Sequence, residues 1–262
     1  MMRAFVKGLG LLGPGLPSWE RGRDILAGDA AYQPTEMPKP VPDILQPTER
    51  RRSSDAVRLA VAVAQEAMTS AAIRVDSVAT VFTSSDGDGW ITHKICELLA
   101  TPEREVSPTL FHNSVYNAPA GYWSIATGSR HPSTSVCAYD ASFAAGLIEA
   151  VSQVTIERQP VLLVAFDLPL PSPLNSVRTV ERPLAAAFVL FPDAVPASLA
   201  TWEISVEQQR TPSPIPDTIP EYFRSNSVGR CLPLMQAMAR RNPDTVWLEY
   251  INGSCVAVRC RP

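Results

Sequence analysis

The chain has 262 residues, 45% of them apolar, and its charged residues nearly balance to a net charge of −3. This composition supports a sizeable core and a soluble globular fold, and apart from Arg50–Arg52 it has no basic run of the kind that nucleic-acid binding requires. No apolar stretch approaches the roughly 20 residues of a membrane-spanning helix, and no secretory leader is recognisable, so we expect a cytoplasmic protein without a membrane span.

The cysteines predict neither disulfides nor a metal site. They are odd in number, widely spaced and without a C-x-x-C pair or a histidine at ligand spacing. They are Cys96, Cys137, Cys231, Cys255 and Cys260. We therefore expect reduced thiols, no structural metal and no cofactor.

Strands and helices are expected to alternate along the first half of the chain. An apolar strand runs into a glycine turn, a loop rich in proline and charge follows, and then comes a helix with an apolar stripe that Ser53 or Ser54 caps. After it, a β-rich run empties into a polar turn and a further helix. The predicted ranges are strand 4–11, loop 17–52, helix 54–72, strand 78–83, turn 84–89 and helix 90–99. This order is that of an α/β protein.

The second half repeats the pattern and then changes. A strand, an alanine-rich helix and three apolar strands are followed by a proline-rich stretch that suits neither helix nor central strand. An Asn-Gly pair between two alternating runs then predicts a hairpin. The predicted ranges are strand 132–136, helix 140–153, strands 160–166, 183–191 and 202–206, linker 211–220, helix 227–240 and strands 246–250 and 255–260. We divide the chain into a domain at 1–206, a linker at 207–226 and a helix-hairpin segment at 227–262.

Residues 107–150 carry the most specific motifs. They include Ser107-Pro108, Asn117 followed by Ala120-Gly121, and Gly128-x-Arg130-x-Pro132 before a strand and a small-residue helix. This segment resembles the β-ketoacyl synthases of the thiolase-like superfamily, and a weaker likeness extends over residues 4–206. The resemblance implies a thiolase-like, layered α/β/α fold that is shortened in its C-terminal half, where 227–262 would be a remnant.

The nucleophile position of that family falls on Asp140. The family uses a cysteine at a helix N-terminus, where backbone N–H groups favour the thiolate. An aspartate cannot form the acyl thioester on which condensation depends. Asp140 also suits a plain helix N-cap. Cys137, three residues earlier, is the other candidate nucleophile, although its strand setting equally suits a small buried residue.

The family's other catalytic groups have no counterpart here. Its two histidines follow the nucleophile, whereas His93, His112 and His131 all precede Asp140. The glycine-rich loop that supplies an oxyanion donor is missing as well. The resemblance thus implies that this chain does not catalyse condensation by itself. It would instead form part of a β-ketoacyl-[acyl-carrier-protein] synthase complex.

The chain is most similar in character to chain length factors, in particular those of aryl polyene and xanthomonadin-type pathways. This likeness implies a heterodimer with a catalytic ketosynthase, which serves fatty-acid- or polyketide-like biosynthesis and meets acyl carrier protein through the complex. Strand 133–138 would pair with the partner, and apolar side chains from both subunits would shape the acyl tunnel. The expected tunnel and interface residues are Leu110, Phe111, His112, Val115, Tyr116, Asn117, Ser135 and Phe143.

Two alternatives stay open at this point. In the first, Asp140 or Cys137 supports acyl transfer or decarboxylation in the same pathway. In the second, the chain only stabilises its partner, and its apolar side chains do not set product length.

Overall fold

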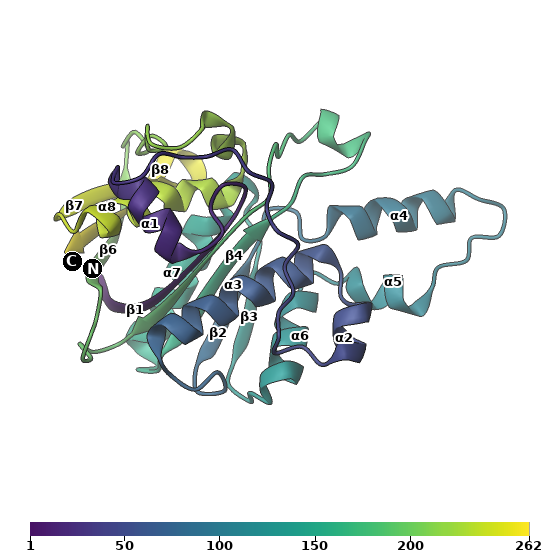
Figure 1. The fold of residues 1–262 in the computed structure, drawn as a ribbon, viewed down its shortest axis with the longest axis horizontal. Coiled ribbons are helices and arrows are strands. Elements are labelled where there is room, and N and C mark those ends of the chain that lie inside the picture. The colour runs from purple at the N-terminus through teal and green to yellow at the C-terminus, as the bar shows by residue number, and fades with distance from the viewer. Residues whose placement is uncertain (262) are drawn as a thin grey trace.

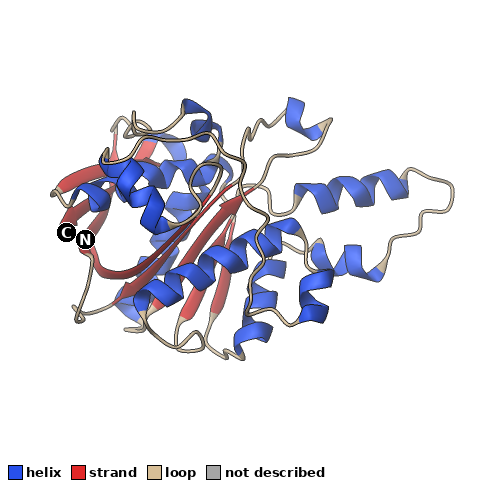
Figure 2. Cartoon of the chain, viewed as in Figure 1, coloured by secondary structure: helices blue, strands red, loops and turns tan. Residues whose placement is uncertain are grey.

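In the computed structural model, which describes residues 1–261, eight strands form one sheet in the order β3-β2-β4-β5-β1-β6-β8-β7. β2 pairs in parallel with β3 and β4, and the remaining pairs are antiparallel. The strands are β1 (Met2–Leu12), β2 (Ala79–Thr83), β3 (Ser133–Val136), β4 (Val161–Asp167), β5 (Leu184–Phe191), β6 (Ala200–Gln208), β7 (Asp244–Glu249) and β8 (Ser254–Arg261). Figure 1 shows their arrangement, and Figure 2 separates strands from helices and loops.

Helices cover both faces of this sheet. The α-helices are α1 (Trp19–Ala27), α2 (Pro47–Arg52), α3 (Asp55–Ala71), α4 (Gly89–Leu99), α5 (Pro108–Asn113), α6 (Ala118–Thr127), α7 (Ser142–Ile156) and α8 (Leu232–Arg240). Short 3-10 turns are η1 (Tyr139–Ala141), η2 (Leu174–Ser176), η3 (Glu221–Ser225), η4 (Ser227–Cys231) and η5 (Ile251–Gly253). None of the helices within residues 1–261 has the length and apolar character needed to cross a membrane.

The core is divided by the sheet into two clusters. Along β4, Leu162 and Val164 belong to the cluster with α3 and α6, while Val161 and Leu163 belong to the cluster with α1, α7 and α8. Successive side chains of a strand point to opposite faces, so a strand buried on both sides is apolar throughout. The predicted three-layer α/β/α fold is confirmed.

Two glycines in β1 let α3 pack directly on the sheet. A Cβ at Gly8 would lie 2.3 Å from the carbonyl oxygen of Ala67, and one at Gly10 would lie 2.4 Å from that of Val63. Because both neighbours are helix backbone, they could not move aside without shifting α3. The glycine strand seen in the sequence therefore serves helix packing.

The predicted loop 17–52 was wrong in part, because it contains α1 and α2. In α1, Ser18 caps the first turn, Gly28 ends the helix with a φ of 95°, and Ile25 and Leu26 enter the core. Nine residues among prolines and charges give a short apolar stripe, which the surrounding composition hides. The expected helix 227–240 is split into η4 and α8, with a proline in the first turn of α8.

The C-terminal residues continue the same sheet. β8 pairs with β6 from Thr201 opposite Arg261 to Gln208 opposite Ser254, and β7 pairs with β8 as the predicted hairpin. At its turn, Asn252 and Gly253 have φ values of 54° and 73°, which the Asn-Gly pair tolerates. The division at 206 and 226 stays a proposal about sequence organisation.

Candidate functional site: the turn between β3 and α7

Residues 137–141 join β3 to α7 through η1. We call them the nucleophile turn, because the sequence resemblance predicts the nucleophile position there. Tyr139 adopts a φ of 54°, an uncommon conformation for a bulky residue. Ser142 closes the turn, because its hydroxyl accepts the N–H of Ala138 at 3.0 Å and donates to the carbonyl of Tyr139 at 2.7 Å. Neither η1 nor α7 has a side-chain N-cap, so the capping role considered for Asp140 is wrong.

Asp140 instead contacts two arginines. Its carboxylate accepts a hydrogen bond from Nη1 of Arg178 at 2.9 Å, and Nη2 of Arg230 lies 3.9 Å away. Arg230 is held in turn by Glu249 at the end of β7. The Asp140 side chain is 43% exposed, while that of Arg178 is 9% exposed. The residue that the sequence resemblance assigns to the nucleophile position is therefore an ion-paired carboxylate.

Arg178 joins this turn to the turn after β2. Its Nε donates to Oδ2 of Asp86 at 2.7 Å, and its guanidinium carbon lies 3.7 Å from the centre of the Tyr139 ring. Burial alone lowers the pKa of Arg178, but the hydrogen bonds to Asp86 and Asp140 outweigh burial and raise the pKa overall. Arg178 is thus a permanent cation between two carboxylates.

The buried Asp167 forms hydrogen bonds that hold the segments behind the nucleophile turn together. This fully buried carboxylate, at the end of β4, accepts the Ser84 hydroxyl and the Ser85 N–H, each at 2.8 Å, and the hydroxyl of Ser227 in η4. Burial raises its pKa, and these hydrogen bonds oppose the rise. The end of β2 and the C-terminal part of the chain are therefore joined behind the turn.

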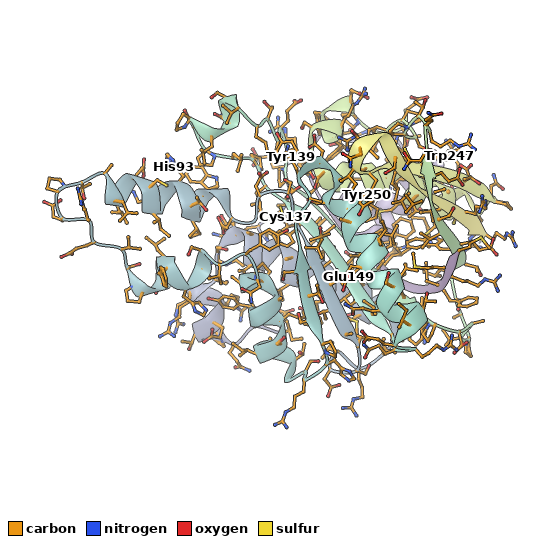
Figure 3. All side chains as sticks on the ribbon, turned by 180° about the vertical axis from the view of Figure 1, so that it is seen from behind. His93, Cys137, Tyr139, Glu149, Trp247 and Tyr250 are labelled. Carbon is orange, nitrogen blue, oxygen red and sulfur yellow. The ribbon has the colours of Figure 1, made fainter. Side chains whose placement is uncertain are left out.

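Tyr116 holds the ends of β2 and β3 together. Its hydroxyl accepts the Ser84 N–H at 2.8 Å and lies 2.5 Å from the carbonyl oxygens of both Ser84 and Val136. Burial raises the pKa of this phenol, which stays neutral. Cys137 is exposed, and its thiol donates to the carbonyl of Ser85 at 3.2 Å. Figure 3 shows Cys137 and Tyr139 on the same face of the molecule.

The predicted tunnel and interface residues do not all lie together. Phe111, His112, Val115 and Asn117 are exposed on α5 and the following turn, and Leu110 beside them is half-buried. α4 and α5 project from the body of the protein (Figure 1). Phe143 lies elsewhere, because its ring is fully buried in this chain's own core, 5.8 Å from that of Phe188.

Ser135 lies on β3, which ends the sheet and pairs with β2 alone among the described strands. On its other side, β3 therefore presents backbone N–H and C=O groups that pair with no described strand.

The histidines stand apart from Asp140. His93 contacts Glu97 at 3.2 Å on α4, His112 lies edge-on to Tyr122 with 5.8 Å between ring centres, and His131 is exposed before β3. Within residues 1–261, no three His, Cys, Asp or Glu side chains gather closely enough to bind a metal ion.

Sequence reasoning missed the arginines. Arg178 lies 38 residues from Asp140 and 92 from Asp86, and no motif links them. An arginine in a proline-rich loop carries no sequence signal for burial, because the sheet brings its distant partners to it.

Comparison with known proteins agrees with the fold. The model of the β-ketoacyl synthase N-terminal domain matches residues 26–245. A search of curated proteins finds no match.

Solved structures resemble the chain over nearly its whole length. A chain of the complex between the ketosynthase ApeO and its chain length factor ApeC from Xenorhabdus doucetiae superimposes with a TM-score of 0.76 at 22% identity, covering 99% of this chain and 100% of that one. The ishigamide ketosynthase/chain length factor gives 0.76 at 10% identity, covering 98% and 99%. A β-ketoacyl synthase from Burkholderia phymatum STM815 gives 0.72 at 11%, covering 100% and 99%. With the family model matched over residues 26–245, the chain belongs to the β-ketoacyl synthase N-terminal domain family.

Proposed function

We propose that this chain is a non-catalytic chain length factor that forms a heterodimer with a competent ketosynthase. The observation that carries the proposal is the state of the nucleophile position, where Asp140 is paired with Arg178 instead of presenting a free nucleophile. A carboxylate held by a guanidinium is a poor nucleophile, and none of the described histidines contacts it as a base. The fold shared with the ApeO–ApeC and ishigamide complexes supports the same role.

The proposed partner surface joins the edge of β3 to the projecting arm, by which we mean residues 89–117. Every residue of α4 is at least partly exposed, and large apolar side chains of the arm are open to solvent. These are Trp90 at 59%, Leu99 at 49%, Phe111 at 68% and Val115 at 49% exposure. An apolar arm beside an unpaired strand edge is a surface that a second subunit would cover.

The proposed tunnel wall consists of Leu110, Phe111 and Val115, with His112, Asn117 and Ser135 at the interface. Tyr116 and Phe143 are left out, because the first is bound to strand ends and the second is core. Enlarging or shrinking an exposed side chain on the arm would change the length of acyl chain that the shared tunnel accepts, at about 0.8 kcal/mol per methylene. We infer polyene-type products, an acyl carrier protein that is met through the complex, and a cytoplasmic location.

The test is co-expression of the chain with the ketosynthase encoded beside it. We expect the two to co-purify, condensation to require both, and the acyl adduct to lie on the partner's cysteine alone. Phe111→Asp should abolish co-purification, whereas Ile156→Asp, a matched change at a residue 78% exposed on the far end of α7, should not. An acyl adduct on Cys137, or condensation by this chain alone, would refute the proposal.

A purely stabilising role is the second candidate. It predicts that Phe111→Leu weakens the complex without changing product length. Product length measured at saturating complex concentration distinguishes the two roles.

A further inference from the structure

The segment between β4 and β5, residues 168–183, leaves the sheet and returns to it. In the view of Figure 1 it extends above α4, with η2 at its tip. Its first part is anchored where Leu170 packs against Gly89, since a Cβ on that glycine would lie 2.1 Å from a Leu170 methyl carbon. Its last part is anchored by the buried Val180 and by the hydrogen bond from the Glu181 N–H to Ser225.

Between these anchors, the segment has little contact with the body of the protein. Among residues 172–179, all of which the structure describes, Arg178 alone has a buried side chain. Its neighbour Val177 is 80% exposed. Segments with so few buried contacts open locally at small cost, so the position of 172–179 depends on what holds Arg178.

Arg178 is held by charge from two separate turns. Asp86 follows β2 and Asp140 follows β3, and the guanidinium bonds both, at 2.7 Å and 2.9 Å. Arg230 and Glu249 extend the cluster on the far side of Asp140. A buried guanidinium that loses its carboxylates is left uncompensated, and moving the segment into solvent is the direct way to relieve it.

The cluster also explains what Asp140 does. It neither caps α7 nor contacts a histidine, and its described charged neighbours are Arg178 and Arg230. The described contacts of the Asp140 carboxylate are therefore its ion pairs with these two arginines.

We propose that Arg178 is a positioning residue whose ion pairs with Asp86 and Asp140 lock residues 172–179 onto the nucleophile turn. The lock is a property of this chain alone. A further step rests on the proposed function: the locked segment, which follows the contact of Leu170 with Gly89 at the start of α4, belongs to the surface that the ketosynthase contacts.

Hydrogen exchange on the full chain tests the lock. We expect Arg178→Met, which keeps the apolar stem and removes the charge, to speed amide exchange in residues 172–179 by about tenfold or more, with α3 unchanged. Asp140→Asn should have a smaller effect in the same segment, and Arg178→Lys should restore part of the protection. The matched control is Arg158→Met, which removes the surface ion pair with Asp193 at 2.6 Å and should leave residues 172–179 as they are.

Three results would overturn the lock. The first is unchanged exchange in Arg178→Met, and the second is an Asp140→Asn effect confined to the first turn of α7, which would make the carboxylate a helix cap. If Arg178→Met does not fold, Asp86→Asn and Asp140→Asn carry the test, because both carboxylates are partly exposed. The third result that would overturn the lock is then normal amide protection of residues 172–179 in the variant that carries both Asp86→Asn and Asp140→Asn.

Co-purification separates the lock from the proposed function. Weaker capture of the ketosynthase by Arg178→Met supports the contact of the segment with the partner, and undiminished capture removes that step while the exchange result stands. If the unaltered chain captures no ketosynthase, the proposed function fails and the lock is judged by exchange alone.

Discussion

The carboxylate of Asp167 accepts a hydrogen bond from the Ser227 hydroxyl, which joins the end of β4 to η4 inside the protein. Ser84 and Ser85 bond the same carboxylate from the other side. A single buried acid thus connects three segments that meet behind the nucleophile turn. Its replacement tests how much of the local order depends on charge.

Asp167→Asn should flatten the pH dependence of stability. Burial raises the folded-state pKa of Asp167 above its ordinary value of 3.8, so the folded state holds its proton to higher pH than the unfolded state. The free energy of unfolding of the natural protein therefore falls as pH rises from the unfolded pKa through the folded one, by about 1.4 kcal/mol for each pH unit that separates the two pKa values. Urea unfolding of the natural protein and the variant, between about pH 3 and pH 8, measures how the free energy of unfolding of each depends on pH. Parallel curves would show that Asp167 does not titrate differently on folding.

Gly10→Ala should destabilise the chain by about 1–3 kcal/mol, because the added methyl group meets the backbone of Val63 and forces α3 away from β1. Gly121→Ala is the matched control, since a Cβ there has no heavy atom within 4 Å and the residue lies inside α6. It should leave stability unchanged or raise it by about 0.5–1 kcal/mol. Denaturant midpoints at constant slope report both changes, and equal effects of the two variants would contradict the packing argument.

Tyr116→Phe should cost about 1–3 kcal/mol, because it leaves the Ser84 N–H without its acceptor near the ends of β2 and β3. The loss should appear as faster amide exchange in β2 and β3, while β7 and β8 keep their protection. Tyr139→Phe is the control, since that ring is 54% exposed and the change removes its hydroxyl alone. A uniform rise in exchange over the whole sheet would assign Tyr116 a global role instead.

Phe143→Ala and Phe111→Ala should separate core from interface. Phe143 is fully buried, so its truncation should lower the free energy of unfolding by about 3–5 kcal/mol in the free chain. Phe111 is 68% exposed, so its truncation should leave the free chain within about 0.5 kcal/mol and weaken ketosynthase binding. Thermal unfolding and a titration with the partner measure the two effects, and the reverse order would overturn the assignment of both side chains.

Much of the fold could be predicted from the sequence, because the pattern of apolar residues has the period of the element it forms. β4 and β5 are continuous apolar runs since both faces are covered, and α3 shows its stripe and its Ser54 cap. α1 escaped prediction, because its stripe is short and lies among prolines. Phe143 was predicted for the tunnel, and nothing in the sequence distinguishes a ring that faces the core from one that faces a partner.

By itself, the sequence determined the family likeness, the layered α/β architecture and the aspartate where a nucleophile was expected, since these follow from residue identity and local spacing. Tertiary structure alone decided what Asp140 contacts. Arg178 reaches it across 38 residues because the sheet brings the ends of β2 and β3 and the 168–183 segment together. Ion pairs between residues that are distant in sequence leave no period or motif, because the distance between their charges is set by the tertiary structure and not by their separation along the chain.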